Sequence, residues 1–248
     1  MKHPLAIALP CVIFVSLLMS SFAAEPQSSG TLTPAQIMEA FKKVSTGNLA
    51  DAVEEATGNP GFMNYDMKPI FKTKIVGPAS TAVLRRILKT DARTYPNQAL
   101  QILDEAPSGN ILVYVLEDGL NIAGMGNLMA TTAKVRGLAG AVIDGGVRDV
   151  EEITQIGFPV YSRSVTPATS VGRLVSVSKN EPVTCAGVRV RPGDYIMGDW
   201  DGIVVIPVEA AAKVVELIRQ YDDKESKMVP IIKETKSMLK ALEKYNRY

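Results

Sequence analysis

Two residues that could do chemistry stand together directly after a pair of glycines. The stretch GAVIDGGVRDVEEI, residues 140–153, begins like a buried β-strand and breaks at Gly145-Gly146 before it reaches Arg148 and Asp149. A guanidinium binds a carboxylate or phosphate through two parallel hydrogen bonds, and a carboxylate binds a divalent cation. Arg148 and Asp149 are therefore candidates for holding an anionic ligand and a metal ion at one strand end.

A structural interpretation of the same pair stays open at this point. Asp149 could cap the helix that is predicted to begin near Val150, with Glu152 at the capping-box position, while Arg148 forms a salt bridge. In that interpretation the glycine pair is only a turn.

The turn GMGNLM, residues 124–129, is the second candidate, because it joins a predicted strand to a predicted helix. The free N–H groups of Leu128 and Met129 would face an anion with the positive end of the helix dipole behind them. Met129 stands where a dinucleotide-binding fingerprint has its third glycine, which excludes a Rossmann nucleotide site. The alternative is a plain glycine turn in which Asn127 caps the helix.

The start of the chain has the three regions of a secretory signal peptide. A basic start that includes Lys2 precedes an apolar run from Leu5 to Leu18, and Ser21 and Ala23 occupy the −3 and −1 places of a cleavage site. We expect cleavage after residue 23 and export to the periplasm or the exterior. A membrane anchor is the alternative, but the run is short for a span.

Loss of residues 1–23 would remove His3, the only histidine, and would leave Cys185 as the only cysteine. This excludes Ser-His-Asp and Cys-His nucleophile systems, a histidine-bound zinc site and an internal disulfide. Any metal would be a hard cation held by oxygen atoms. Without Lys2, the 27 basic residues become 26, which equals the 26 acidic residues. The mature chain would therefore have no net positive charge to attract nucleic acid.

Periodicity and turn residues predict an α/β layered domain with several parallel strands. Strands are expected at 74–87, 111–116, 138–146 and 158–164, followed by short alternating strands up to Pro207. Helices are expected at 34–43, within 45–58, and at 96–106, 126–137 and 149–157. We divide the mature chain into a leader with its helix (24–44), the α/β domain (45–208) and a C-terminal helical region (209–248). That last region is expected to be interrupted at Pro230 and to pack on the domain or on a neighbouring subunit.

Five segments between Ser45 and Pro207 carry a family resemblance: STGNLADAVEEATG, GPAST, GNLMATTAKVRGLAGAVIDGGVRD, FPVYSRSVTPATSVGR and GVRVRPGDYIMGDWDGIVVIP. The segments resemble one family, which holds the class II 4-hydroxy-4-methyl-2-oxoglutarate aldolases and the RraA-like regulators of ribonuclease E activity. They occur in the same order as in that family. The resemblance implies a layered α/β/β/α sandwich of the swivelling, phosphohistidine-like type. It also implies homotrimers or homohexamers with sites between subunits.

The same resemblance implies a retro-aldol reaction that depends on Mg²⁺ or Mn²⁺. A 2-oxo acid chelates the metal, and C–C cleavage leaves a pyruvate enolate whose charge the metal absorbs. Arg148 matches the arginine that grips the pyruvyl group, and Asp149 matches the single direct protein ligand of the metal. Gly126, Asn127, Leu128 and Met129 match the loop that holds the substrate, with the backbone amides of the last two on its carboxylate.

One departure concerns the proton relay. Aldolases of the family usually carry an aspartate where this chain has Asn127, and an amide cannot take a proton from a water molecule. A further acidic residue comes, in the family, from the C-terminal helix of a neighbouring subunit. Glu225 is the best match for it, with Asp222 and Asp223 close by, and the alternative for all three is a solvated helix surface.

Three other candidates have stronger structural interpretations. Lys134 could form a Schiff base, but a lysine on this predicted helix is expected to be exposed or interfacial. The motif GDWDGI, residues 198–203, has two aspartates in metal-like spacing and is expected to be a hairpin with Asp201-Gly202 at its tip. Cys185 is expected to pack in a strand.

The favoured function is a divalent-metal-dependent lyase of small 2-oxo acids, with retro-aldol cleavage of 4-hydroxy-2-oxo dicarboxylates to pyruvate and oxaloacetate decarboxylation as a related activity. The alternatives are a non-catalytic RraA-like binding or regulatory protein, and a lyase for another substrate such as a sugar acid. The expected partner is a small oxo acid, with no nucleic acid and no membrane after signal cleavage.

Overall fold

The computed structural model describes residues 32–87 and 94–245, so the predicted signal peptide lies outside the described residues. The helices are α1 (Pro34–Lys43), α2 (Thr46–Thr57), α3 (Gln98–Glu105), α4 (Asn127–Val135), α5 (Val150–Ile156), α6 (Ala211–Thr235) and α7 (Met238–Tyr245). The strands are β1 (Lys68–Pro69), β2 (Ile75–Arg86), β3 (Ile111–Leu116), β4 (Ala123–Met125), β5 (Gly140–Val147), β6 (Val160–Val165), β7 (Leu174–Lys179), β8 (Val183–Cys185), β9 (Val188–Val190), β10 (Tyr195–Gly198) and β11 (Ile203–Ile206).

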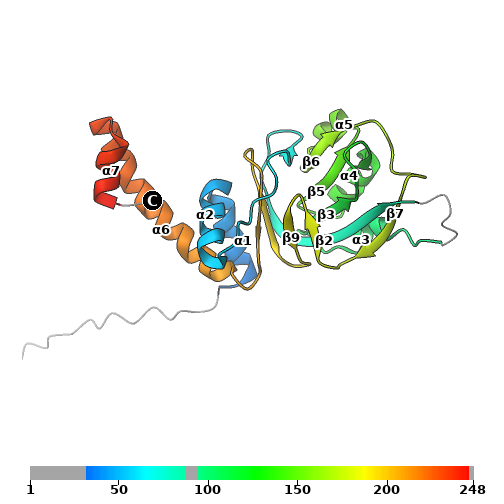
Figure 1. Ribbon diagram of the computed structural model, residues 1–248, viewed down its shortest axis with the longest axis horizontal. Helices are drawn as coiled ribbons and strands as arrows, with labels where there is room; N and C mark the ends of the chain where they lie inside the picture. Colours follow the sequence, from blue (N-terminus) through cyan, green and yellow to red (C-terminus); the bar gives the residue numbers. More distant parts are fainter. Residues whose placement is uncertain (1–31, 88–93, 246–248) are drawn as a thin grey trace, which may run out of the picture. The chain divides into compact units, whose positions relative to one another are not determined.

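A mixed nine-stranded sheet forms the centre, in the order β1-β6-β5-β3-β2-β10-β11, with β4 paired to β5 and β7 paired to β2 (Figure 1). Strands β2, β3, β5 and β6 run parallel. The long strand β2 belongs to two parts of the sheet, because its start pairs antiparallel with β10 and its end pairs antiparallel with β7. This shared strand lets one sheet supply two stacked layers.

Three hydrophobic cores separate four layers. The first lies between α3–α5 and the parallel strands and includes Ile102 and Leu112. The second lies between the two strand layers and includes Val113 and Ile196. The third joins β10 and β11 to α1, α2 and α6 and includes Ile218. Leu112 and Val113 follow one another in β3 and enter different cores, as the alternation of side chains along a strand requires. The predicted α/β/β/α layering is confirmed.

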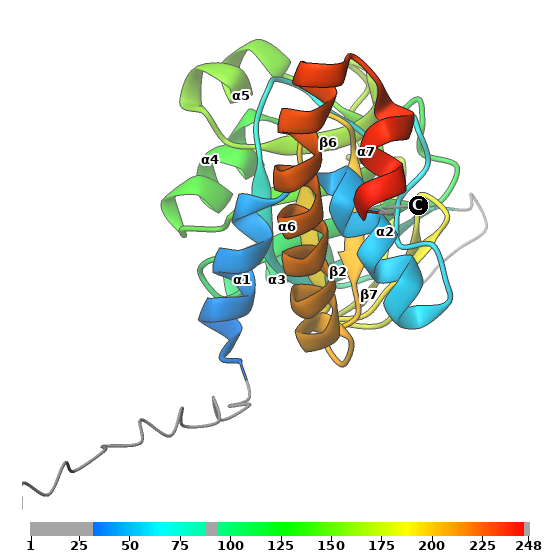
Figure 2. The same cartoon turned by 90° about the vertical axis from the view of Figure 1, so that its left-hand side faces the viewer.

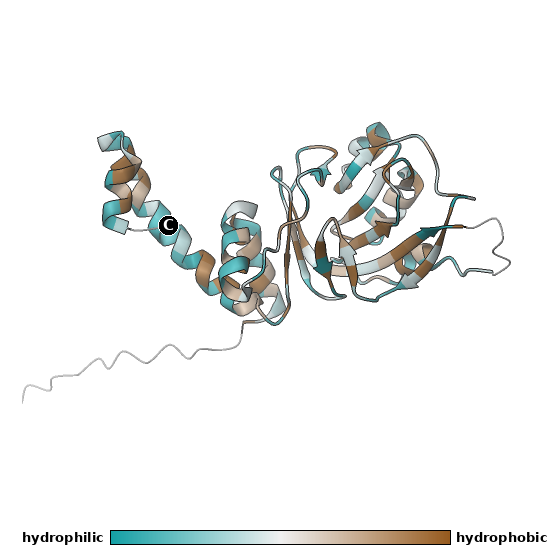
Figure 3. Ribbon diagram, in the orientation of Figure 1, coloured by the Kyte–Doolittle hydropathy of each residue, from teal (hydrophilic) through white to brown (hydrophobic). Residues whose placement is uncertain are grey.

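The outer helical layer combines both ends of the described chain. Figure 2 shows α6 lying between α1 and α2, and buried residues of all three helices share the third core. Figure 3 shows mixed apolar and polar residues along α6 and α7. Within the described ranges, no helix is both long and apolar enough to cross a bilayer.

Local signals placed most element ends correctly. Thr33 caps α1 in a capping box with Gln36, and the left-handed residues Gly58 and Gly157 end α2 and α5. The prediction of an interruption at Pro230 was wrong, since α6 continues through it to Thr235. Pro230 is exposed, so water can bond the backbone carbonyl that its missing N–H leaves free.

Candidate functional site

Parallel pairing of β4 and β5 brings the two candidate segments together. Ala123 pairs with Gly146, and Met125 pairs with Val147, so both strands end side by side. The Arg148 N–H then donates to the Met125 carbonyl at 3.1 Å. After this point one chain segment enters α4 and the other enters α5. The site therefore forms where two strand ends and two helix starts meet, which is where open α/β sheets bind ligands.

Asp149 links the two segments with one of its carboxylate oxygens. Oδ2 accepts the backbone N–H of Asn127 at 2.9 Å and lies 3.5 Å from Nε of Arg148. The backbone of Asp149 is left-handed, with φ of 55°, and its side chain makes no capping hydrogen bond to α5. Asp149 therefore occupies the predicted N-cap position of α5, but the predicted cap by its side chain is absent. Among the described residues, Oδ1 has no recorded hydrogen-bond partner and stays open to a cation.

Gly126 makes this approach possible. A Cβ atom on Gly126 would lie 2.6 Å from Asp149 Oδ2 and 3.0 Å from Arg148 Nε. Both distances are shorter than ordinary van der Waals contacts. The backbone of Gly126 is extended, a conformation that any residue can adopt, so backbone conformation does not require glycine here. The requirement for glycine here is therefore one of space for the carboxylate and the guanidinium.

Arg148 keeps most of its hydrogen-bonding capacity free. Its side chain is 42% exposed, and its one recorded acidic neighbour is Asp149, which faces Nε. Within residues 32–87 and 94–245, neither Nη atom has a recorded acceptor. An arginine in this state can offer both terminal nitrogens to an oxyanion.

A cavity of about 290 Å³ lies against these groups. We call it the site cavity; it is lined by residues 123–126, Leu128, Met129, Arg148, Asp149, Leu100 of α3 and residues 169–171. The backbone N–H groups of Leu128 and Met129 lie in the first turn of α4, where no earlier helical carbonyl can accept them. They add partial positive charge to the same wall as Arg148.

Asn127 takes a different position from the one predicted. Gly126, not Asn127, is the N-cap of α4, so the interpretation of Asn127 as the cap is wrong. Its backbone N–H is held by Asp149, and its side-chain Oδ1 accepts the Thr131 hydroxyl at 3.2 Å. Its side chain is not part of the site cavity wall.

The predicted acidic residues of the C-terminal helix contact other parts of the chain. Glu225 Oε2 accepts the side-chain N–H of Asn48 in α2 at 3.1 Å. Asp223 pairs with Lys227 at 2.6 Å, and Asp222 lines a depression beside α1. Within one chain, none of them lines the site cavity.

The other sequence candidates have structural roles. Asp199, in the turn of the confirmed β10–β11 hairpin, accepts the N–H and the hydroxyl of Thr46 at 2.9 and 2.6 Å and the N–H of Asp201 at 2.9 Å. Burial alone would raise the pKa of Asp199, but these hydrogen bonds outweigh it and lower that pKa. Lys134 is exposed and donates to the Ile156 carbonyl. Cys185 is buried in β8, and burial raises the pKa of its thiol.

Sequence reasoning missed the far wall of the site cavity. Leu100 comes from α3, and Thr169, Ser170 and Val171 come from the segment between β6 and β7. The segment SVTPATSVGR was noticed only as part of a resemblance, and an isolated bridge between Ala123 and Thr169 brings it to the site. No local pattern reveals such a bridge.

Comparison with known proteins identifies the family. The RraA-like family model, described as Aldolase/RraA, matches residues 46–205, which include the whole site apart from the C-terminal helices. The chain belongs to the RraA-like family. A relative from Halalkalibacterium halodurans, provisionally named a 4-hydroxy-4-methyl-2-oxoglutarate aldolase, is 30% identical over 190 residues, or 74% of this chain and 83% of that protein.

Two solved structures share the fold. An uncharacterized protein from Pseudomonas syringae pv. tomato DC3000 has a TM-score of 0.78 at 25% identity and covers 87% of this chain and 96% of its own. RraAS2 from Streptomyces coelicolor, described as an unusual member of the RNase ES inhibitor RraA family, has a TM-score of 0.69 at 25% identity over 79% of this chain and 96% of its own. The RraA-like family therefore contains proteins named for aldolase activity and proteins named for ribonuclease inhibition.

Proposed function

We propose that this RraA-like protein is a lyase for small 2-oxo acids that uses Mg²⁺ or Mn²⁺ and releases pyruvate. Its main reaction is the retro-aldol cleavage of 4-hydroxy-2-oxo acids, and oxaloacetate decarboxylation is a second reaction through the same enolate. One observation carries the proposal: Arg148 with both Nη atoms free and Asp149 with Oδ1 free line one cavity beside a helix N-terminus.

The donor set fits a hard cation with few protein ligands. Among residues 32–87 and 94–245, no three side chains of Asp, Glu, Cys or His gather as a metal site. Asp149 alone would hold the ion, and Mg²⁺ and Mn²⁺ are suited to a site in which water fills the other positions. When bound, such a cation supplies a Lewis acid for the keto oxygen of the substrate.

The protein groups bind and orient the substrate. The N–H groups of Leu128 and Met129 hold its carboxylate, and Arg148 reaches the oxygen on which charge develops. Cleavage breaks the C3–C4 bond, and its electron pair moves toward the C2 oxygen. The C4 hydroxyl loses its proton to water as the aldehyde or ketone forms, and C3 takes up a proton to complete pyruvate. Arg148 stabilises the negative charge between these two proton transfers.

The test is pyruvate release from a panel of oxo acids by the purified protein, with and without Mg²⁺ or Mn²⁺. Arg148→Ala should reduce kcat/KM by about 10²-fold, since it removes a charged donor from the developing oxyanion. Arg136→Ala, at the exposed end of α4, is the matched control and should leave turnover unchanged. Activity that persists after chelation, or that ignores Arg148, would contradict the proposal.

Asn127 supports a second candidate, a binding protein without turnover. Among the described residues that line the site cavity, Asp149 has the one carboxylate, and no second acid stands there to act as a general base. Asn127→Asp tests whether a carboxylate at this position, although outside the cavity wall, can act on the substrate through a water molecule, because general-base help is worth on the order of 10²–10⁴-fold in rate. A slow lyase should gain aldol turnover in this variant, whereas a binding protein should bind pyruvate and still release none.

The proposal includes an oligomer outside the cytoplasm. Leu128 and Val171 border the site cavity and are 83% and 80% exposed, which supports coverage by a second subunit in a homotrimer or homohexamer. Glu225 would then reach a neighbouring site, and this is tested by light scattering together with the activity of Glu225→Gln. N-terminal sequencing of the exported protein tests cleavage after residue 23.

A further inference from the structure

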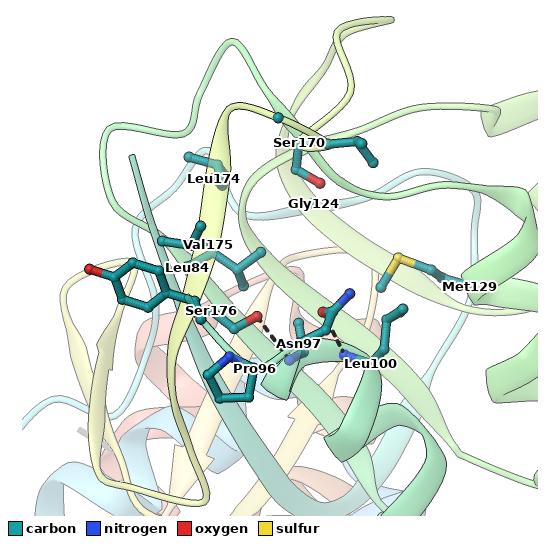
Figure 4. A pocket seen from close by; sticks show the side chains of 14 residues that line it. Leu84, Pro96, Asn97, Leu100, Gly124, Met129, Ser170, Leu174, Val175 and Ser176 are labelled. Carbon is teal, nitrogen blue, oxygen red and sulfur yellow. Dashed lines mark hydrogen bonds between the residues drawn. The ribbon is translucent and has the colours of Figure 1, made fainter. Parts of the chain in front are cut away.

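A second cavity adjoins the site cavity and extends it. It also has a volume of about 290 Å³, and the two cavities share Leu100, Gly124, Met129, Ser170 and Val171 in their walls. We call it the side cavity. Its other walls come from the start of α3, from Leu84 of β2 and from residues 174–176 of β7. Figure 4 shows Met129 and Leu100 beside the space that Leu174, Val175 and Leu84 border.

The described lining of the side cavity is largely apolar and carries no charge. Leu84, Leu100, Met129, Leu174 and Val175 contribute to it, and none of its described lining residues is an aspartate, glutamate, lysine or arginine. Among the described residues that line the two joined cavities, Arg148 of the site cavity is the one cation. A ligand whose carboxylate and keto oxygen occupy the site cavity would therefore meet no second cation from this described lining beyond its C4 atom.

Two polar side chains of the side cavity accept the N–H groups at the start of α3. Ser176 Oγ accepts the Ala99 N–H at 3.0 Å, and Asn97 Oδ1 accepts the Leu100 N–H at 3.4 Å; both bonds are drawn in Figure 4. These are N–H groups of the first turn of α3, which would otherwise be able to receive an anion. With these N–H groups taken, the helix start offers no free backbone donor to a carboxylate, and only neutral hydroxyl and amide groups of the described lining could replace its lost water, which is unfavourable for a charge.

We propose that the side cavity holds the distal part of the substrate and selects an uncharged, apolar chain beyond C4. The preferred substrates are thus 4-hydroxy-2-oxo monocarboxylic acids with an alkyl group, and the second product is an aliphatic aldehyde. A dicarboxylate, which the name of the Halalkalibacterium halodurans relative indicates, fits less well. The inference rests on the proposed function, because Arg148 must hold the oxo-acid end.

Two analogues that cannot be cleaved test this inference by binding alone. 2-Oxohexanoate and 2-oxoadipate have six carbons each and differ in a terminal methyl group against a terminal carboxylate. Calorimetric titration of the purified protein with Mg²⁺ should give at least about a 10-fold lower Kd for 2-oxohexanoate, given that one methylene in a fitted apolar pocket is worth roughly 10-fold or more. Equal or tighter binding of 2-oxoadipate would overturn the inference.

Val175 lines the side cavity and not the site cavity, so its variants act on the distal group alone. Val175→Lys should make the Kd values of 2-oxohexanoate and 2-oxoadipate equal or reverse their order. Val175→Phe should weaken the binding of 2-oxohexanoate at least 10-fold. Neither should change the Kd of pyruvate, which ends within the site cavity. Val135→Lys, at a 79% exposed valine outside both cavities, is the matched control and should change nothing. A selectivity that Val175→Lys leaves unaltered would contradict the assignment of the side cavity.

Pyruvate separates failure of this inference from failure of the proposed function. If pyruvate binds in an Arg148-dependent way but the six-carbon pair is not discriminated, the apolar selection is wrong and the lyase proposal stands. If neither pyruvate nor 2-oxohexanoate binds with Mg²⁺ present, both fail.

Discussion

Two arginine–aspartate sets flank the glycine pair of β5, and they differ in how completely their atoms are used. In the first, Arg163 places all three guanidinium nitrogens within 3.0 Å of Asp66 or Asp144 oxygens. The second oxygen of Asp144 accepts the Ala186 N–H at 2.6 Å. In the second set, Arg148 and Asp149 approach only to 3.5 Å and keep free atoms toward a cavity.

Exposure and electrostatics follow the same division. The side chains of Arg163 and Asp144 are 23% and 14% exposed, against 42% and 36% for Arg148 and Asp149. Hydrogen bonds to Asp66 and Asp144 raise the pKa of Arg163, so its charge is fixed. The first set, Arg163 with Asp66 and Asp144, is closed and connects β5 to β6 and to the turn after β8. The second set, Arg148 with Asp149, is open and can bind a ligand in the site cavity. Asp66 Oδ1 of the closed set is buried without a hydrogen-bond partner, so the difference lies in unused atoms that face a cavity, as those of Arg148 and Asp149 do.

The largest expected effect comes from removing the open carboxylate. Asp149→Ala should lower pyruvate release by about 10²–10³-fold, because a Lewis-acid metal supplies several kcal/mol of charge stabilisation. The melting temperature should change little, since the Asp149 side chain is part-exposed and makes no capping hydrogen bond to α5. Parallel turnover and Mn²⁺-binding measurements check this. Loss of the fold with normal metal affinity would make Asp149 a scaffold residue.

Removing the closed carboxylate should produce the reverse pattern. Asp144→Asn leaves the partly buried Arg163 with less compensation and should lower the free energy of unfolding by about 2–3 kcal/mol. The kcat/KM of the remaining folded protein should be little changed. Asp118→Asn, at an exposed aspartate, is the control for urea unfolding and should be neutral. A stable Asp144→Asn protein would remove the contrast between the two sets.

Gly126→Ala should reduce kcat/KM by about 10-fold, or about 1.4 kcal/mol, because the new Cβ displaces Asp149 Oδ2 and Arg148 Nε. The control is Gly47→Ala in α2, whose Cβ would meet nothing closer than Ser45 Oγ at 3.7 Å. That control should be neutral or slightly stabilising. Equal activity of the two variants would show that the tight approach at Gly126 has no role.

The smallest effect concerns Asp199 and acid. Its lowered pKa means that it stabilises the fold above its unfolded value of about 4, and that this contribution is lost as pH falls through the lower folded value. Asp199→Asn should therefore cost about 1 kcal/mol of unfolding free energy at pH 7 and less at pH 3. Urea unfolding at both pH values checks this. If wild type and Asp199→Asn differed in unfolding free energy by the same amount at pH 7 and pH 3, the charge of Asp199 would not contribute to stability.

Local sequence signals predicted the part of the site that local structure builds. Arg148, Asp149, Leu128 and Met129 all lie where a strand ends and a helix begins, and glycines mark both places. The Asp149–Asn127 hydrogen bond could not be predicted, because it depends on how β4 pairs with β5 across 22 residues. That bond also decides that Gly126, rather than Asn127, occupies the cap.

The side cavity was beyond sequence reasoning for the same reason. It forms only where α3, α4 and β7 converge. In the sequence, the apolar residues of each element are already explained by packing in the core, so none of them indicates a cavity. The layered fold was easier, since alternation in β3 already assigns Leu112 and Val113 to opposite faces. Pro230 shows the limit of single-residue rules, because an exposed proline on a helix anchored by buried neighbours does not end it.

The shared layer of α1, α2 and α6 has a consequence for how the chain is made. About 150 residues separate Thr57 from Ala211, so the first two helices leave the ribosome long before the helix that covers them. At synthesis rates of about 5–20 residues per second, that interval is roughly 8–30 s. During it the apolar faces around Phe41 and Leu49 have no α6 to pack against. The nascent protein thus stays without one of its cores until α6 emerges, which gives chaperones a defined period in which to bind it.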